Sequence, residues 1–247
     1  MEKTQVVVIG LGGVGSWAAE ALVRSGICRI TIVDNDLICP SNINRQIQAL
    51  PGTVGLPKTA ALMKRLLEIN PHCDVTAFNK IFSLETAPLF GIEKADYVID
   101  AIDSFPYKLD LIEYVCSAPQ RPILSSSKRP ALFSSMGTAQ KSDPTRIKTA
   151  DIWNTRGCPL ARVVRQGLKK RGFTGHFTAV YSDEQFPRPE VELYEPEGLV
   201  SFADGVRKKL INGSIVTVTA AAGMILANLV IQMVYHSMTD HCSDEGS

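Results

Sequence analysis

Three side chains in the first half of the sequence, Arg45, Lys58 and Asp103, are of types that act on phosphate groups. Arg45 offers a planar fork of N–H donors, Lys58 a compact positive charge, and Asp103 a carboxylate of the kind that holds Mg²⁺. Nucleotidyl transfer needs this combination, because a triphosphate must be screened and charge develops at its α-phosphate. The three residues therefore favour transfer chemistry over hydride transfer on an intact redox dinucleotide.

A glycine-rich segment near the start of the chain predicts where the phosphates bind. The apolar run Val6 to Ile9 is typical of a buried strand, and Trp17 to Arg24 is typical of a helix. Between them Gly10, Gly12 and Gly15 have G-x-G-x-x-G spacing, in which the glycines permit a tight turn, a close approach of phosphate, and close helix packing. A nucleotide is therefore expected at the helix N-terminus.

Asp34 follows a second apolar run, Ile30 to Val33, at the place where such a unit binds a ribose hydroxyl. The alternative for the other polar residues is ordinary: Arg45 and Lys58 are surface charges, and Asp103 caps a helix. Their occurrence together, beside the glycine segment, favours the functional interpretation.

Strand and helix patterns alternate through the first half, which predicts an α/β fold. We expect a Rossmann-like, mostly parallel sheet with helices on both faces and a less regular C-terminal half. Residues 1–247 are expected to form one domain, with a nucleotide-binding half (1–127) and a half (128–247) that binds the substrate or tRNA and forms the dimer contact. The expected strands after the second are 75–78, 97–102 (followed at once by Asp103), 122–124 and 147–150, and the expected helices after the first are 57–69, 83–90, 107–116 and 159–170.

The overall composition excludes few classes of function, but it indicates the cellular compartment. The net charge of +1 gives no global indication of nucleic acid or membrane, so any such contact must come from a local patch. The six cysteines include no C-x-x-C pair, which favours free thiols in a reducing cytoplasm and gives no sign of a zinc site. No signal peptide is apparent before the first strand.

Two segments of the second half are harder to assign. Ile211 to Ser237 has no charged residue; we expect a buried core helix, with a membrane anchor as the alternative. Tyr181 to Gly205, rich in proline and acidic residues, is expected to be an exposed loop.

The combination GLGGVGS, D-x-D-x(5)-N-x-x-R-Q, V-G-x-P-K and a strand-end Asp resembles the ubiquitin-activating-like adenylyltransferase family. The resemblance implies a homodimeric enzyme that adenylates a carboxylate with ATP and Mg²⁺. It also implies that Asp34 takes the ribose and that Asp103 binds the metal. By position the phosphate cradle would comprise Gly10, Gly12, Gly13, Gly15 and Ser16, and the triphosphate would be surrounded by Asp36, Asn42, Arg45, Gln46 and Lys58.

The second half resembles one branch of that family, the tRNA threonylcarbamoyladenosine dehydratases. The resemblance lies in Ser134 to Arg146, Ala150-Asp-Ile, Pro159-Leu-Ala and Tyr181 to Glu184. It implies adenylation of the threonine carboxylate of a modified adenosine near the tRNA anticodon, followed by ring closure. A basic helix is then expected to meet the tRNA, through Arg162, Arg165, Lys169, Lys170 and Arg171, helped by Lys128 and Arg129.

Two alternatives stay open. The first is an adenylyltransferase for a ubiquitin-like sulfur carrier, with a sulfur-transfer partner, although its members usually carry two C-x-x-C zinc pairs. The second is a catalytically weakened nucleotide-binding homologue, because family members usually have an arginine before the first strand that reaches the partner subunit's ATP.

Overall fold

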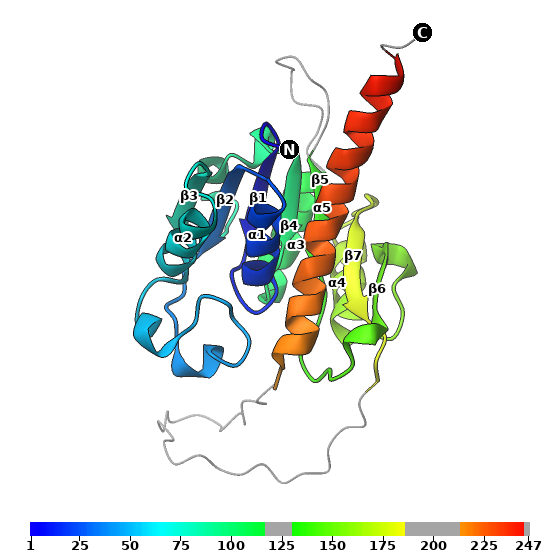
Figure 1. Cartoon of the computed structure of the whole chain (residues 1–247). Helices are drawn as coiled ribbons and strands as arrows, with labels where there is room; N and C mark the ends of the chain where they lie inside the picture. Colours follow the sequence, from blue (N-terminus) through cyan, green and yellow to red (C-terminus); the bar gives the residue numbers. More distant parts are fainter. Residues whose placement is uncertain (117–129, 186–212, 245–247) are drawn as a thin grey trace, which may run out of the picture.

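A seven-stranded sheet runs through the centre of the computed structural model, which describes residues 1–116, 130–185 and 213–244 (Figure 1). The strand order is β3-β2-β1-β4-β5-β7-β6. Neighbouring strands are parallel except for β6 and β7, which are antiparallel. The mostly parallel α/β fold is thus confirmed. The strands are β1 (Gln5–Ile9), β2 (Arg29–Asp34), β3 (Asp74–Asn79), β4 (Tyr97–Asp100), β5 (Ala131–Ser135), β6 (Ile147–Asp151) and β7 (Thr178–Ser182).

Helices cover both faces of this sheet because the central strands are apolar on both sides. Along β1, Val6 and Val8 belong to one hydrophobic cluster, and Val7 and Ile9 to the other. The first cluster is completed by α1 (Gly15–Arg24), α2 (Lys58–Ile69) and α5 (Val216–Asp244). The second is completed by α3 (Phe105–Cys116) and α4 (Pro159–Lys170), which lie behind the sheet in Figure 1.

The direction in which successive strands are added to the sheet reverses between the neighbouring strands β1 and β4. From β1 the chain builds outward through β2 and β3, and from β4 it builds the opposite way through β5. Open α/β sheets bind their ligands at such a point, outside the carboxyl ends of the strands. Asp34 is the last residue of β2, and Gly10 and Asp103 lie in the loops that follow β1 and β4 at this end.

The predicted fourth strand was too long. It ends at Asp100 rather than running to Ile102, because the Asp100 carboxylate turns the chain by accepting from the Ile102 amide (3.0 Å) and from Lys108 Nζ (2.7 Å). Asp103 therefore lies in the loop before α3. The predicted helix 83–90 was also too long, since only a 3₁₀ turn, Ala87–Phe90, forms there.

Strand β5 lies in the stretch Arg129-Pro-Ala-Leu-Phe-Ser-Ser, which is similar in sequence to Arg121-Pro-Ile-Leu-Ser-Ser-Ser just before it. Ala131 pairs with Tyr97, whereas the predicted strand 122–124 lies outside the described residues. Tyr181 and Ser182 were wrongly expected in a loop: both are buried in β7, whose antiparallel partner β6 gives their backbone groups hydrogen bonds. The rest of that predicted loop, from residue 186, is outside the described residues.

Helix α5 packs against α1 through one regular face. Its buried residues recur at helical spacing: Val218, Ala222, Leu226, Val230 and Val234. At Gly223 a Cβ would lie 2.5 Å from the carbonyl oxygen of Val14, so only glycine allows the two helices to approach this closely. Val216–Ser237 is long and apolar enough to cross a membrane by length and composition alone, which core helices of soluble proteins also satisfy.

Candidate functional site

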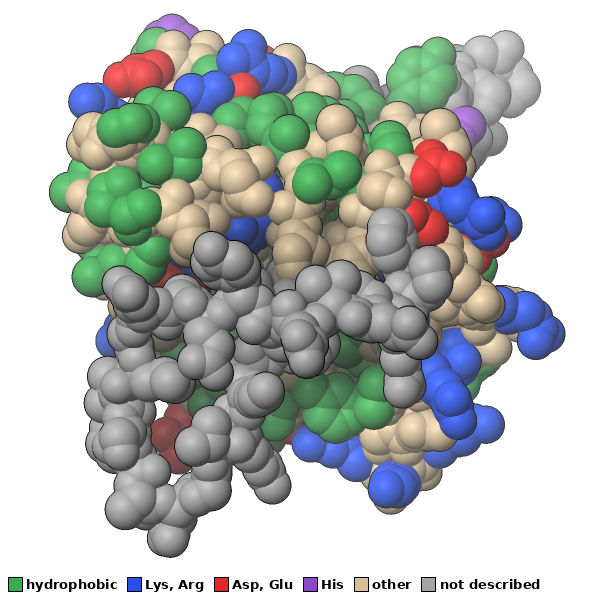
Figure 2. All heavy atoms as spheres, turned by 90° about the horizontal axis from the view of Figure 1, so that it is seen from below, with side chains coloured by type: hydrophobic (Ala, Val, Ile, Leu, Met, Phe, Trp, Pro, Cys, Tyr) green, Lys and Arg blue, Asp and Glu red, His purple; other side chains and the backbone are tan. Residues whose placement is uncertain are grey.

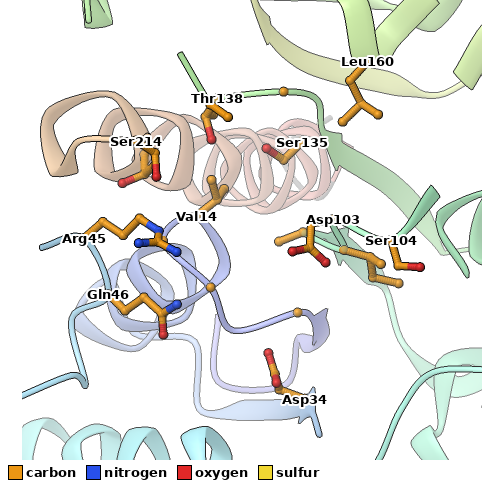
Figure 3. A pocket seen from close by; sticks show the side chains of 18 of the residues that line it. Val14, Asp34, Arg45, Gln46, Asp103, Ser104, Ser135, Thr138, Leu160 and Ser214 are labelled. Atoms are coloured by element: carbon orange, nitrogen blue, oxygen red, sulfur yellow. The ribbon is translucent and has the colours of Figure 1, made fainter. Parts of the chain in front are cut away.

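A cavity of about 1330 Å³ opens at the carboxyl ends of β1, β2 and β4. Arg45, Lys58 and Asp103, which lie apart in the sequence, all line it together with the glycine turn, so their predicted convergence is confirmed. Figure 3 shows Arg45 and Asp103 in the cavity wall. The predicted site residues found in its wall are Gly10, Gly12, Gly13, Asp34, Asp36, Asn42, Arg45, Gln46, Lys58 and Asp103.

The three motif glycines serve different physical needs. Gly10 has φ +90°, and a Cβ there would lie 2.5 Å from the carbonyl oxygen of Ala101. At Gly15 a Cβ would lie 1.8 Å from the carbonyl oxygen of Gly10. Both are therefore required by the fold. At Gly12 a Cβ would meet nothing within 4 Å, so this glycine leaves open space for a ligand to approach the backbone.

Gly15 and Ser16 do not line the cavity, although phosphate contacts were expected from both. Ser16 is fully buried, and its hydroxyl donates to the carbonyl oxygen of Gly12 (2.7 Å). The structure thus places Ser16 beneath the turn, where it fixes the shape of the loop.

Replacing Gly12 with alanine is expected to leave the fold intact and to weaken nucleotide binding about tenfold. The added methyl group has room in the empty protein but occupies the space where phosphate would meet the backbone. Calorimetric titration with ATP and a thermal melt measure the two effects. Gly52→Ala, equally unobstructed but remote from the cavity, is the control; a melting temperature lowered by Gly12→Ala alone would contradict the assignment.

Asp34 is held in place by donors from two loops. Its carboxylate accepts from the amides of Leu11 (2.7 Å) and Asp36 (2.8 Å), and Lys58 Nζ lies 3.8 Å away. Burial raises the pKa of Asp34 above its usual value, against the opposing effects of Lys58 and the two amides. Lys58 itself pairs closely with Asp36 (2.7 Å), so its charge is largely balanced by these two carboxylates.

Nucleotide affinity should decrease as the pH falls through the raised pKa of Asp34, because a protonated carboxyl is a poorer acceptor for a ribose hydroxyl. In the empty protein the sign is reversed: a raised folded-state pKa makes this carboxyl's contribution to stability fall as the pH rises through that pKa. ATP titrations between about pH 4 and 7 test the first effect. Asp34→Asn should bind weakly with no such step, and a parallel step in this variant would assign it to another group.

Arg45 is the cation whose charge stays available. Its Nη1 donates to two neutral acceptors, the carbonyl oxygen of Ser41 and Oδ1 of Asn44 (2.9 Å each). Trp17 Nε1 donates to the Arg45 carbonyl oxygen (2.9 Å), which anchors the backbone to α1. Within residues 1–116, 130–185 and 213–244, no carboxylate lies within 4.0 Å of the Arg45 guanidinium.

Gln46, the neighbour of Arg45, carries a buried oxygen that lacks a partner. The residue is 5% exposed, lines the cavity, and its Oε1 has no hydrogen bond within the described part of the chain. An unsatisfied buried acceptor costs about 1–3 kcal/mol, which a donor on a ligand would recover. In Figure 3 Gln46 lies below Arg45, on the same side of the cavity as Asp34.

Asp103 faces the cavity from the loop between β4 and α3, across from Arg45 (Figure 3). It is exposed, and the residues described include no group of three or more His, Cys, Asp or Glu side chains that could hold a metal ion. A single carboxylate suits Mg²⁺ that keeps water and shares phosphate oxygens, rather than an all-protein metal site.

The opposite wall of the cavity was missed by reasoning from single residues. It comes from the loop after β5, the start of α4 and the residues before α5, and Figure 3 shows Ser135, Thr138, Leu160 and Ser214 there. The signal available was positional, since Ser135 ends a parallel strand at the ligand-binding end of the sheet.

The basic residues of α4 divide into two groups. Arg165 donates to the carbonyl oxygen of Thr155, and Arg171 pairs with Asp110 and Glu113, so these two stabilise the fold. Arg162, Lys169 and Lys170 stay exposed. Lys128 and Arg129 are outside the described residues. Figure 2 shows Lys and Arg side chains gathered on the right of the face that carries the cavity.

Comparisons with known proteins agree with this architecture. The tRNA threonylcarbamoyladenosine dehydratase of Bacillus subtilis (strain 168) is 43% identical over 184 residues, which cover 74% of this chain and 68% of that protein. The crystal structure of E. coli tRNA N6-threonylcarbamoyladenosine dehydratase, TcdA, in complex with ATP matches with a TM-score of 0.77 and 32% identity, over 97% of this chain and 88% of that one.

The sulfur-carrier alternative receives less support. The adenylyltransferase and sulfurtransferase MOCS3 of Drosophila yakuba is 32% identical over 127 residues, or 51% of this chain and 28% of that protein. Across the five curated relatives named as dehydratases, the alignments span 40% to 68% of each relative's length. A model of the ThiF family matches residues 1–245, and this chain belongs to the ThiF family.

Proposed function

We propose that this protein is an ATP-dependent dehydratase that cyclises threonylcarbamoyladenosine in tRNA. The observation that carries the proposal is the convergence of Arg45, Lys58 and Asp103 beside an open glycine turn, in a cavity whose opposite wall comes from the segments after β5 and before α5. The relatives that align over most of this chain are named for that reaction, and ATP and AMP complexes of TcdA share its fold.

In this proposal each residue on the side of the cavity that carries the glycine turn has one role. Asp34 accepts a hydrogen bond from a ribose hydroxyl, and the backbone at Gly12 binds phosphate. Arg45 stabilises the negative charge that develops at the α-phosphate in the transition state. Asn42, Gln46, Lys58 and Asp36 surround the triphosphate. Asp103 would hold Mg²⁺, which when bound screens the departing pyrophosphate.

The chemistry follows from holding two reactants together. A threonine carboxylate oxygen attacks the α-phosphorus, the bond to pyrophosphate breaks, and an acyl adenylate forms. A nucleophile within the same modified side chain then attacks the acyl carbon and expels AMP, which takes one carboxylate oxygen with it. Ring closure is intramolecular, so its effective concentration is high and no enzyme thiol is needed.

The exposed apolar residues support a homodimer. The loop 36–56 exposes Leu37 (51%) and Leu50 (52%), and α5 exposes Met224 (44%) and Met233 (49%). Figure 2 shows hydrophobic side chains gathered on the upper left of the cavity face. We propose that a second copy covers them. Met224→Glu should then give a monomer in light scattering, whereas Leu84→Glu, also exposed, should not; a monomeric unmodified protein would contradict this.

A cytoplasmic location fits the free thiols of Cys28, Cys39, Cys73 and Cys158.

The decisive experiment follows oxygen. tRNA carrying threonylcarbamoyladenosine with an ¹⁸O-labelled carboxylate is incubated with ATP and the protein, and mass spectrometry should find the cyclic nucleoside together with AMP that carries one ¹⁸O atom. Unlabelled AMP, or no AMP, would reject the proposal. ATP–pyrophosphate exchange that requires a small carrier protein instead of tRNA would support the sulfur-carrier alternative.

A further inference from the structure

The cavity is larger than a nucleotide alone requires. Its volume of about 1330 Å³ exceeds the roughly 300–1,000 Å³ typical of small-ligand pockets. The glycine turn, Asp34 and Gln46 occupy one side, whereas Ser135, Thr138 and Leu160 lie across from them (Figure 3). This second side has room for another reactant, and it contains one lysine, Lys141, that the nucleotide site described above does not use.

Lys141 is a mostly buried cation whose hydrogen-bonding capacity is only partly filled. It is 8% exposed and lines the cavity, and its ammonium donates to the main-chain carbonyl oxygen of Glu184. Among the residues described, this neutral oxygen is its one hydrogen-bond acceptor, and no carboxylate oxygen lies within 4.0 Å. An ammonium has three donors, so two are left for an anionic oxygen in the cavity.

The neighbouring carboxylate is occupied elsewhere. Glu184 accepts from the amides of Ser142 (3.0 Å) and Asp143 (3.0 Å) and from the Ser142 hydroxyl (2.8 Å). Burial raises the pKa of Glu184, but these donors and the charge of Lys141 together lower it. Glu184 therefore serves to fasten the loop that carries Lys141, and does not itself form an ion pair with the ammonium.

The backbone before Lys141 is also fixed by distant segments. Gln140 has φ +56°, a conformation that non-glycine residues rarely adopt, and its amide donates to the carbonyl oxygen of Gly213 (2.8 Å). The segments after β5, after β7 and before α5 thus meet at this point. Such preorganisation is expected of a side chain that contacts a ligand.

We propose that Lys141 contacts an anionic oxygen of the RNA substrate, on the wall of the cavity opposite the ATP site. This inference rests on the proposed function. Two oxygens have the required chemistry: the threonine carboxylate of the modified nucleoside, and a phosphodiester that flanks it. Lys141 is a substrate-binding residue in either case, and the affinity for ATP does not depend on it.

Fluorescence anisotropy with a modified anticodon stem-loop tests the contact. Lys141→Met should weaken RNA binding roughly 10- to 100-fold, as expected for a lost charged hydrogen bond, while the Kd for ATP stays unchanged. Lys64→Met removes the same charge from an 82% exposed side chain of α2 and should leave both affinities unchanged. Lys141→Arg, which keeps the cation, should restore most of the RNA affinity.

Competition by the free modified nucleoside separates the two sources. If Lys141 contacts the carboxylate, Lys141→Met should weaken binding of the free nucleoside as well as binding of the RNA. A phosphodiester contact predicts that only RNA binding falls, and that its logarithmic salt slope decreases by about 0.7–0.9. The inference would be overturned by an unchanged RNA affinity in Lys141→Met, or by equally poor RNA binding in Lys141→Arg and Lys141→Met. A loss of ATP affinity alone in Lys141→Met would also overturn it.

Failure of the proposed function gives a different result. In that case the unmodified protein forms no cyclic nucleoside or AMP, whereas the binding comparison between Lys141→Met and Lys64→Met still reports whether Lys141 meets RNA.

Discussion

Replacement of Arg45 with methionine will lower the rate of AMP formation about 100- to 1,000-fold, the range found when a single charge-stabilising donor is removed from an active site. The effect should be large because the described hydrogen-bond partners of the Arg45 guanidinium are neutral, so its charge is available at the nucleotide side of the cavity. The charge of Lys58 is largely balanced by its ion pairs with Asp34 and Asp36. Arg45→Met should reduce kcat more than it raises the KM for ATP, because the charge it meets develops in the transition state.

Single-turnover release of AMP measures this effect, with the melting temperature as a check of folding. The matched control is Arg29→Met, an exposed arginine at the opposite end of β2, which should keep full activity. If Lys58→Met reduced the rate far more than Arg45→Met, the assignment of the transition-state charge to Arg45 would be wrong.

Replacement of Lys108 with methionine will lower the free energy of unfolding by about 3–5 kcal/mol, the usual result of leaving one buried charge without its partner. Lys108 and Asp100 are both 0% exposed, with Nζ 2.7 Å from Oδ2. The ammonium also donates to the Ser135 carbonyl oxygen (3.0 Å), and the Ser134 hydroxyl donates to Asp100 (2.6 Å). The pair therefore joins α3 to the ends of β4 and β5, beneath the cavity.

Urea unfolding followed by circular dichroism gives the free energy directly. Lys64→Met, whose exposed partner is Glu68, should change it very little. The double variant Lys108→Met with Asp100→Leu should recover much of the loss, since two apolar side chains replace a buried ion pair at low cost. A double variant as unstable as the single one would show that packing, rather than the unpaired charge, sets the penalty.

Half of the candidate site could be predicted because its residues carry local signals. The glycines of the turn and Asp34 belong to a strand–turn–helix unit whose spacing follows from backbone geometry. Arg45 and Lys58 lie on the loop and helix that follow directly. Asp103 was expected directly after the fourth strand; it does line the cavity, but the strand ends earlier, at Asp100, whose carboxylate pairs with Lys108 inside the fold.

The other half could not be predicted from local patterns, because long-range contacts position it. Lys141 depends on Glu184, 43 positions away, and Gln140 on Gly213. Asn44 donates to the carbonyl oxygen of Ser214, which joins the Arg45 loop to the start of α5. None of these pairings has a periodic signal in the sequence.

The sequence by itself determined the strand–helix alternation, the glycine turn and the residues that border it, since these depend on hydrophobic periodicity and on backbone conformations open only to glycine. The tertiary structure alone decided which charges remain available. Burial and neighbouring groups commit Lys108 and Asp100 to each other and Lys58 to its carboxylates, and leave Arg45 and Lys141 facing the cavity with neutral partners. The charge of a side chain is set by its type, but its availability depends on distances of a few ångströms between segments remote in the chain.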